Sequence, residues 1–250
     1  MRLPVNFKKL PFFWTIKLFL KRLVGRELWL SKDLSIDTIV LGEWEFCPQY
    51  INQQSVIYSL GVGDSIEFDI GVIKHHGCEV HAFDPTPYSV NWIASQNTPS
   101  GFQFHPWAVS GRDGSLSMIQ RTNKRGQKSE VMWTEAPSES LAEDIIEVPV
   151  YSIPSIMKKL DHRFISIMKI DVEGAEYEII DDILHNGVLP EQILIEFHHR
   201  FNNKNKKMTL NTIKDLQKFG YRIFSISETG REVGFIKLGN QEKDLESFMG

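Results

Sequence analysis

Four short segments of this 250-residue sequence carry polar side chains directly after apolar runs, where they could bind a ligand or move a proton. The first is the turn Gly61-Val62-Gly63-Asp64, which follows the apolar run 56–60. Two glycines let the backbone turn sharply and approach a ligand, and the helix start behind them offers free N–H groups. Many strand–helix turns need such glycines without binding anything, so this segment alone leaves both interpretations open.

The second segment ends in Asp84, about 20 residues after the glycine turn, as in dinucleotide-binding units. A carboxylate in this position can accept hydrogen bonds from both hydroxyls of a ribose. The alternative is that Asp84 only caps the helix that Pro85 and Pro87 open. The glycine turn and the acid together favour a nucleoside ligand.

The other two segments combine acids with a lysine and an imidazole. Asp171 ends the most apolar run, and Glu196 and His198 lie two residues apart at the end of another, so they share one face. We expect these three side chains to meet across adjacent strands, where a carboxylate–imidazole group acts as a general base or holds a divalent metal. Base catalysis needs no metal, and none is expected.

Lys169 and Glu173 flank Asp171, and a charged side chain at each position has a different structural explanation. Glu173 lies in a first helical turn, where an acid complements the helix dipole. Lys169 lies inside a strand that the pattern predicts to be buried on both faces, so its charge needs a partner.

The elements that must position these residues alternate between strands and helices from residue 56 onward. This alternation predicts a mostly parallel, doubly wound sheet, in which ligands bind beyond the carboxyl ends of the strands. Residues 111–140 are predicted to form a hairpin and a loop that shape a pocket for the ligand. Strands are expected at 56–60, 79–83, 102–109, 148–151, 165–171, 192–197, 221–226 and 232–238, and helices at 64–76, 85–97, 153–160, 174–184 and 209–219.

The charge distribution divides the chain into a basic head and an acidic body. Residues 1–32 carry eight basic side chains and one acid, so the net charge of −4 becomes +7 there and −11 elsewhere. An acidic body argues against nucleic acid as the ligand of the core. The two cysteines, Cys47 and Cys78, fit no paired motif and are interpreted as reduced thiols in a cytoplasmic protein.

The basic head is predicted to contain an amphipathic helix over residues 8–26, and no segment is long and apolar enough to span a membrane. Its apolar face either lies on an anionic membrane surface as a peripheral contact or packs on the core, and the two remain open. We therefore divide the chain into the helix at 1–30, a connector at 31–55, a main domain at 56–240 and a tail at 241–250.

The motifs resemble one family. The run Lys169-Ile170-Asp171-Val172-Glu173-Gly174-Ala175-Glu176 is similar to the signature of FkbM-type methyltransferases. Segments 57–64 and 77–85 resemble the methyltransferase-like branch of that family, and Trp107-Ala108-Val109-Ser110 with Asp113-Gly114 matches its third segment. The resemblance covers about residues 42–238. It implies a Rossmann-like class I methyltransferase domain, with three α/β/α layers around a mostly parallel seven-stranded sheet.

The resemblance also implies S-adenosylmethionine (SAM) as cofactor and methyl transfer to a hydroxyl of a sugar, glycan or small metabolite. His198 or Asp171 then serves as base, with Glu196 orienting it, and Lys169 and Glu173 organise the acceptor. The cofactor is expected on Gly61, Gly63 and Asp64, with its ribose on Asp84 and its adenine near Trp107 and Ala108.

Two positions depart from the usual methyltransferase pattern and keep other functions open. Ser59 replaces the acid that normally holds the methionine amino group, a role that Asp64 or Glu67 could take, and Ser65 replaces the third glycine. A non-catalytic binding or scaffold protein, including a membrane-associated adaptor, is one alternative. A nicotinamide-dependent oxidoreductase is another, although Ile66 stands where its glycine pattern needs a third glycine. The sequence specifies neither the acceptor nor the oligomeric state.

Overall fold

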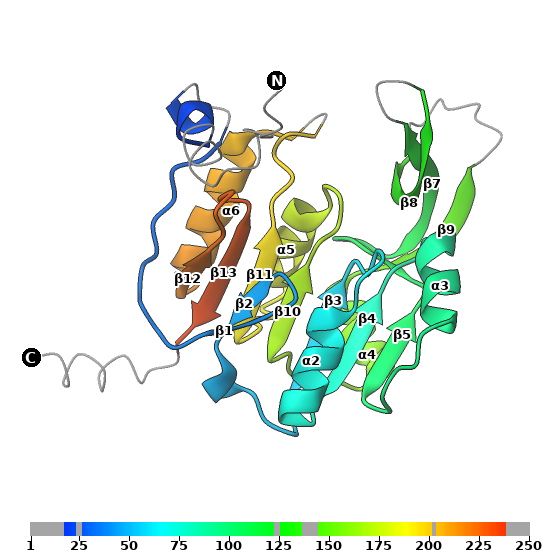
Figure 1. The fold of residues 1–250 in the computed structure, drawn as a ribbon, viewed down its shortest axis with the longest axis horizontal. Coiled ribbons are helices and arrows are strands. Elements are labelled where there is room, and N and C mark those ends of the chain that lie inside the picture. Colours follow the sequence, from blue (N-terminus) through cyan, green and yellow to red (C-terminus); the bar gives the residue numbers. More distant parts are fainter. Residues whose placement is uncertain (1–17, 24–26, 123–125, 137–144, 202–203, 239–250) are drawn as a thin grey trace, which may run out of the picture.

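A seven-stranded sheet forms the centre of the computed structural model, which describes residues 18–23, 27–122, 126–136, 145–201 and 204–238 (Figure 1). All seven strands run in the same direction except β13, which lies antiparallel between β12 and β11. The predicted mostly parallel, seven-stranded sheet is therefore confirmed. In spatial order the strands are β12 (Tyr221–Ile226), β13 (Glu232–Lys237), β11 (Gln192–Glu196), β10 (Ile167–Ile170), β3 (Val56–Leu60), β4 (Glu79–Phe83) and β5 (Phe102–His105).

Helices cover both faces of this sheet and complete three layers. One apolar core joins Tyr58, Met168 and Ile195 to α4 (Ile153–Leu160), α5 (Glu176–His185) and α6 (Lys206–Lys218). A second core joins Ile57, Ile167 and Leu194 to α2 (Glu67–His76) and α3 (Pro87–Ala94). Alternate residues of one strand enter different cores because successive side chains point to opposite faces of a sheet.

The connector contributes a hairpin that the sequence pattern did not predict. Strands β1 (Ile39–Leu41) and β2 (Trp44–Phe46) precede the short helix η2 (Pro48–Tyr50) and pack on the α2 side of the sheet. The buried Gln192 amide holds the hairpin, since it accepts from the Cys47 N–H at 2.8 Å and donates to the Cys47 carbonyl at 3.0 Å. Three-residue strands are too short to show alternation, which explains why they were missed.

A smaller four-stranded sheet stands beside the main one (Figure 1). The strand expected over 102–109 is divided at Pro106, because β5 belongs to the main sheet and β6 to the smaller one. The hairpin expected within 111–140 is present as β7 and β8, whereas 137–144 lie outside the described residues. The smaller sheet has the order β6 (Ala108–Val109), β9 (Ile146–Tyr151), β7 (Gly114–Thr122) and β8 (Lys128–Glu135).

Only part of the expected N-terminal helix lies within the described residues. Residues 18–23 are helical, with Leu18 buried and Phe19, Leu20 and Leu23 each at least half exposed. Three large apolar side chains of this turn are therefore exposed, and Leu18 is covered. No helix within the described part of the chain is long and apolar enough to cross a bilayer. Peripheral membrane contact stays a prediction.

Candidate active site

The glycine turn after β3 has two glycines with different physical roles. Both have positive φ, +84° at Gly61 and +57° at Gly63. A Cβ atom at Gly61 would lie 1.9 Å from the Asp171 carbonyl oxygen, so only glycine allows the ends of β3 and β10 to approach so closely. Nothing lies within 4 Å of the corresponding position at Gly63, so its backbone faces open space. Gly61 therefore serves the fold, and Gly63 is accessible to a ligand.

Asp84 holds this turn from the end of β4. Its Oδ2 accepts from the N–H groups of Val62 at 3.0 Å and Gly63 at 3.1 Å. Its Oδ1 accepts from the Thr86 N–H at 2.9 Å and the Thr86 hydroxyl at 2.7 Å. These bonds occupy about all the acceptor positions of a carboxylate. Thr86 rather than Asp84 is the N-cap of α3, because its hydroxyl accepts from the Ser89 N–H. Asp84 therefore connects the turn to that cap.

Lys169, which the sequence predicts to organise the acceptor, instead lies beneath the glycine turn. Its ammonium donates to the Gly61 carbonyl at 2.8 Å and lies 5.2 Å from the centre of the Trp44 ring. The fully buried Asp69 of α2 interacts with Lys169 and with the Ser59 hydroxyl. Burial raises the pKa of Asp69, and the Lys169 charge opposes that rise. The Lys169 charge, which needs a partner because it is buried, thus has two: the Gly61 carbonyl and the buried Asp69 carboxylate.

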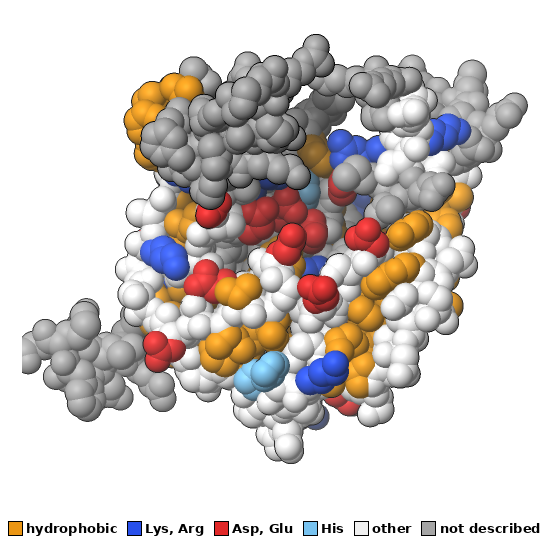
Figure 2. Space-filling model, in the orientation of Figure 1, with side chains coloured by type: hydrophobic (Ala, Val, Ile, Leu, Met, Phe, Trp, Pro, Cys, Tyr) orange, Lys and Arg blue, Asp and Glu red, His pale blue; other side chains and the backbone are white. Residues whose placement is uncertain are grey.

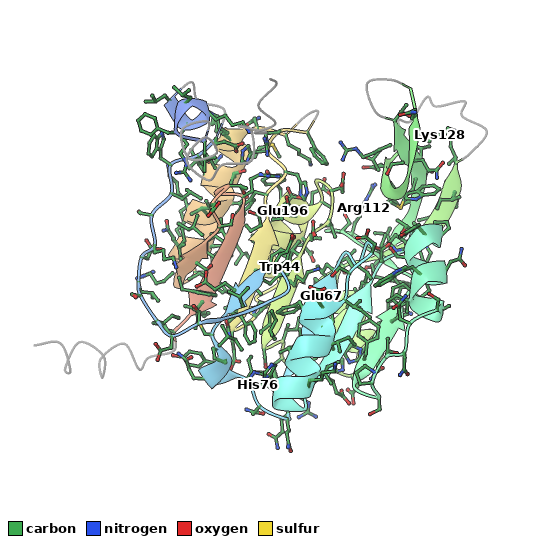
Figure 3. The ribbon with its side chains drawn as sticks, viewed as in Figure 1. Trp44, Glu67, His76, Arg112, Lys128 and Glu196 are labelled. Carbon is green, nitrogen blue, oxygen red and sulfur yellow. The ribbon has the colours of Figure 1, made fainter. Side chains whose placement is uncertain are left out.

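Asp171, Glu196 and His198 converge beyond the ends of β10 and β11, as the sequence predicts. Each offers a ligand or proton-accepting atom within 4.8 Å of the others. His198 Nε2 lies 3.9 Å from Asp171 Oδ1, and His198 Nδ1 lies 3.6 Å from Glu176 Oε1. We call Asp171, Glu176, Glu196 and His198 the strand-end cluster. Figure 3 labels Glu196 at the end of β11, and acidic side chains gather in the middle of the face shown in Figure 2.

Glu176, in the first turn of α5, is the member of the strand-end cluster to which the sequence analysis gives no role. Its side chain is completely buried and accepts from the Gly174 N–H at 2.9 Å and the His198 N–H at 2.8 Å. A single carboxylate therefore fixes the loops after β10 and β11 to each other. Its complete burial could not be read from its position in a first helical turn.

Two members of the strand-end cluster, Glu196 and His198, have raised pKa values. Burial, and then the charge of Asp171, raise the pKa of Glu196 to about 7, although Arg231 lies 3.2 Å from it. Burial by itself lowers the pKa of His198, but the hydrogen bond and charge of Glu176, with the other carboxylates, outweigh it and raise that pKa. The cluster can therefore take up and release a proton near neutral pH.

The smaller sheet reaches this cluster through Arg121 of β7. Arg121 forms an ion pair with Glu173, and its guanidinium lies 4.3 Å from the centre of the Phe201 ring. Phe201 in turn contacts the His198 ring, with ring centres 4.8 Å apart. Glu173 thus lies beside β7, and its role at the acceptor stays a prediction. Sequence reasoning missed Arg121, which lies in a strand of the smaller sheet, and Phe201, which lies in the loop after β11.

The residues expected at the adenine lie where β5 passes into β6. Trp107 is half buried among His105 and Tyr151, with ring centres 4.6 Å and 5.2 Å away, and Ala108 is buried in β6. Asp64 is exposed beside the glycine turn. An adenine contact at Trp107 and Ala108 stays a prediction.

A small cavity separates the β1–β2 hairpin from β13. Its volume is about 130 Å³, and its lining includes Trp44, Leu194 and Glu232. Ligand pockets usually measure about 300–1,000 Å³, so this space is too small for a nucleoside cofactor. The open backbone at Gly63 is the better place for one.

The strand order, the single antiparallel strand β13 and the glycine turn followed by an acid after the next strand define a Rossmann-like methyltransferase fold. Comparison with family models agrees: residues 48–223 match the methyltransferase FkbM domain, and the chain belongs to that family. This range lies within the segment of about 42–238 that carries the resemblance.

Two curated relatives bear the name "Probable methyltransferase-like protein 24". The human protein (Homo sapiens) is 24% identical over 187 residues, which are 70% of this chain and 43% of that protein. The rat protein (Rattus norvegicus) is 23% identical over 187 residues, with 70% and 44% covered. The chain thus spans less than half the length of these relatives. No solved structure matches it.

Proposed function

We propose that this chain is a SAM-dependent methyltransferase that methylates a hydroxyl oxygen of a sugar or small metabolite. The observation that carries the proposal is the shared location of the glycine turn and the strand-end cluster. Asp171 N–H donates to the Leu60 carbonyl at 2.9 Å, directly before Gly61, so the proton-binding group adjoins the turn that would hold a cofactor. Cofactor and acceptor therefore meet at neighbouring strand ends, where such sheets bind ligands.

The described residues fit SAM. Gly63 leaves open space over the turn, and Asp64 is exposed beside it. A ribose hydroxyl can replace the Thr86 hydroxyl on Asp84, since both are O–H donors. Trp107 and Ala108 are the residues proposed for the adenine. When bound, SAM supplies an electrophilic methyl group on a positively charged sulfonium, and the acidic surroundings favour that charge.

The strand-end cluster supplies the proton chemistry. We assign His198 as the base that takes the proton from the acceptor hydroxyl, because three carboxylates stabilise the imidazolium that forms. Asp171 remains the alternative base, and Glu196 orients the group. The Glu176 carboxylate positions His198 by accepting a hydrogen bond from the His198 backbone N–H. The remaining task of the protein is to align the acceptor oxygen with the methyl group.

The acceptor is proposed to lie between the strand-end cluster and the β7–β8 hairpin. Arg121 and Glu173 offer charged hydrogen-bonding groups there, which suits a polyhydroxylated molecule. Lys169 is not part of this surface, because it is buried under the glycine turn.

A metal-assisted transfer is the second candidate. Asp171, Glu196 and His198 together offer two carboxylates and one imidazole, which suit Mg²⁺, Mn²⁺ or Fe²⁺. The two mechanisms separate in a transfer assay with and without EDTA. Base catalysis predicts an unchanged rate in EDTA, and metal assistance predicts loss of activity that Mg²⁺ or Mn²⁺ restores.

Calorimetric titration with SAM, S-adenosylhomocysteine and NAD tests the proposal. We expect binding of the first two and none of NAD. NAD binding alone would indicate an oxidoreductase, and no binding of any would indicate a scaffold. Formation of S-adenosylhomocysteine with a panel of sugars and small hydroxyl compounds then identifies the acceptor. In that assay His198→Asn should be about 10²–10⁴-fold slower, and the exposed His185→Asn should match the wild type.

Replacement of Asp84 tests the cofactor assignment separately. Asp84→Ala removes a charged acceptor and should weaken SAM binding about 10- to 150-fold, the equivalent of about 1.5–3 kcal/mol. Asp84→Asn should also weaken it, because an amide cannot accept both N–H groups of the turn together with the Thr86 pair. Unchanged SAM affinity in both variants would show that Asp84 does not bind the cofactor.

A further inference from the structure

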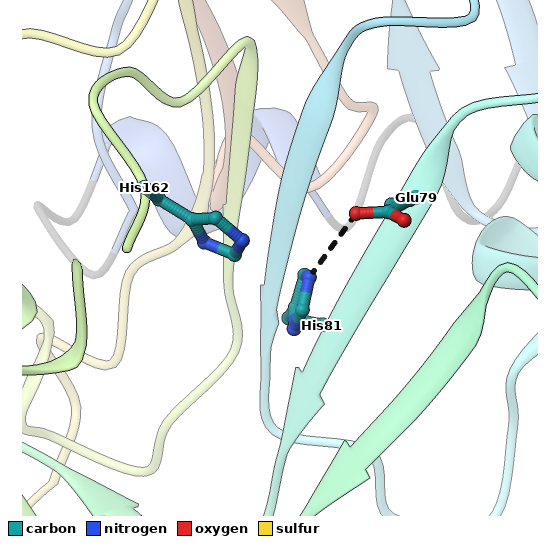
Figure 4. A group of neighbouring side chains, drawn as sticks. All are labelled: Glu79, His81 and His162. Carbon is teal, nitrogen blue, oxygen red and sulfur yellow. Dashed lines mark ion pairs between the residues drawn. The ribbon is translucent and has the colours of Figure 1, made fainter. Parts of the chain in front are cut away.

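A second group of acid and imidazole side chains lies on the face of the main sheet, away from the strand ends (Figure 4). It consists of Glu79 and His81 of β4 and His162 of the loop after α4, and we call it the sheet-face site. His81 Nε2 lies 3.8 Å from Glu79 Oε2, and the three residues each offer one ligand atom within 4.8 Å of the others. Glu79 begins β4 and Asp84 follows its end, about 17 Å away along the strand.

Each imidazole of the sheet-face site has one ring nitrogen already occupied. His81 Nδ1 lies 3.1 Å from His105 Nε2, and His162 Nδ1 lies 2.8 Å from the Tyr58 hydroxyl. When Nδ1–H donates in both pairs, both Nε2 atoms keep a free lone pair. Histidines that bind metals nearly always donate their other N–H in this way, which fixes the ring orientation.

The Nε2 atom of His81 is an unpaired polar atom in a buried place. The His81 side chain is 3% exposed, and its Nε2 has no hydrogen-bond partner among the described residues. Buried polar atoms nearly always form hydrogen bonds. An unpaired His81 Nε2 that faces the Glu79 carboxylate therefore indicates a place for a bound group. Burial and the neighbouring imidazoles lower the pKa of His81 to about 4, so the ring is neutral at physiological pH.

The backbone before His162 is also set for this arrangement. Asp161 is the one non-glycine residue of the described chain with positive φ, +56°, and it ends α4. This uncommon conformation turns the chain so that His162 lies on the sheet, with its ring centre 4.5 Å from that of His81. Sequence reasoning did not identify this group, because His162 comes from a segment far along the chain from Glu79 and His81.

We propose that Glu79, His81 and His162 form a binding site for a divalent transition metal, with Zn²⁺ as the best match. Two imidazoles and one carboxylate are a common three-ligand set for Zn²⁺, with water in the fourth position. Mg²⁺ and Ca²⁺ prefer oxygen ligands only and match the set poorly. Glu79 is 55% exposed, so the ion has access from solvent.

Binding requires the three side chains to close around the ion. Zn–N and Zn–O bonds measure about 2.0–2.2 Å, so the ligand atoms must draw together by roughly 1 Å. The exposed Glu79 side chain and the His162 loop can move by this amount, whereas His81 is fixed by the core. The bound ion would tie the loop after α4 to β4 and stabilise the fold.

Titration of the metal-free full chain with Zn²⁺, and with Co²⁺ as a spectroscopic probe, tests the site. We expect Zn²⁺ to bind here and to raise the thermal midpoint. Glu79→Gln should weaken binding at least 10-fold and His162→Asn at least 100-fold, with loss of the Co²⁺ absorption of a tetrahedral site. Both residues reach the surface, so circular dichroism should show a retained fold. Tyr58→Phe should weaken binding about 10- to 100-fold, as expected for a residue that orients a ligand.

Two control variants separate this site from the rest of the molecule. His185→Asn, at the exposed end of α5, should bind Zn²⁺ as the wild type does. Asp171→Asn should leave the Zn²⁺ affinity of the sheet-face site unchanged, because it alters only the strand-end cluster. The proposal is overturned if the wild type fails to bind Zn²⁺, if Glu79→Gln and His162→Asn bind it normally, or if Asp171→Asn abolishes binding.

Discussion

The strand-end cluster and the sheet-face site contain the same side-chain types, yet their surroundings give the imidazoles opposite proton affinities. In the strand-end cluster His198 is surrounded by three carboxylates, which raise its pKa. In the sheet-face site His81 is buried among His105 and His162, and its pKa falls to about 4. A histidine whose pKa neighbouring carboxylates raise suits acid–base chemistry, and one that stays neutral suits a metal. The neighbours, rather than the residue type, decide the role.

The two regions also differ in how their acids are held. Glu176 is fully buried and accepts two backbone N–H groups. Glu79 is more than half exposed, and its carboxylate lies 3.8 Å from the His81 ring nitrogen. Glu176 is thus held in place by the fold, whereas the Glu79 side chain can move toward a ligand.

The largest expected effect is on stability. Glu176→Ala leaves the N–H groups of Gly174 and His198 without their acceptor, at about 1–3 kcal/mol each, so the free energy of unfolding should fall by about 2–6 kcal/mol. Glu79→Ala should change the metal-free protein by no more than about 0.5 kcal/mol, as is usual for an exposed side chain. Urea denaturation followed by circular dichroism measures both. Equal losses of unfolding free energy in the two variants would contradict the different roles assigned to Glu176 and Glu79.

The next largest effect is the separation of the two histidine titrations. NMR titration of the metal-free protein should show His198 titrating above its ordinary pKa and His81 near pH 4. Asp171→Asn should lower the pKa of His198 without moving that of His81. If both rings titrate together near their ordinary pKa, the neighbours do not tune them as described.

A smaller effect follows from the raised pKa of Glu196. Its pKa is about 7 in the folded chain and near 4.5 when unfolded, so the folded state binds more protons between these values. The stability contribution of Glu196 is fully present below pH 4.5 and is lost as the pH rises through about 7. Glu196→Gln should therefore gain stability relative to the wild type between pH 5 and pH 8, on the order of 2 kcal/mol. A stability difference that is flat over this range contradicts the raised pKa.

The sequence predicted the main sheet and the convergence of Asp171, Glu196 and His198 because both depend on local patterns. Apolar runs mark the parallel strands, and a two-residue spacing at a strand end puts Glu196 and His198 on one face. The same reasoning could not find Arg121, which reaches the cluster by way of the hairpin of another sheet. It also placed Lys169 with the acceptor, since nothing in the local pattern shows that Asp69 lies opposite it.

The sheet-face site shows the same limit more strongly. His81 and His162 are 81 residues apart, and their contact depends on how α4 packs over β3 and β4. Periodicity identifies which face of a strand a residue occupies, but not which loop covers it. The β1–β2 hairpin was missed for a different reason, since its strands have only three residues each.

The central claim is that the glycine turn beside the strand-end cluster holds the cofactor, and one pair of glycine variants tests it most directly. Gly63 and Gly187 have similar positive φ, +57° and +69°, and open space where a Cβ would lie. Alanine therefore causes similar backbone strain at both, but only Gly63 lies at the turn. Calorimetric titration with S-adenosylhomocysteine should show at least about 10-fold weaker binding, about 1.4 kcal/mol, for Gly63→Ala and wild-type affinity for Gly187→Ala. Equal affinity in both variants, or no binding to the wild type, would contradict the account.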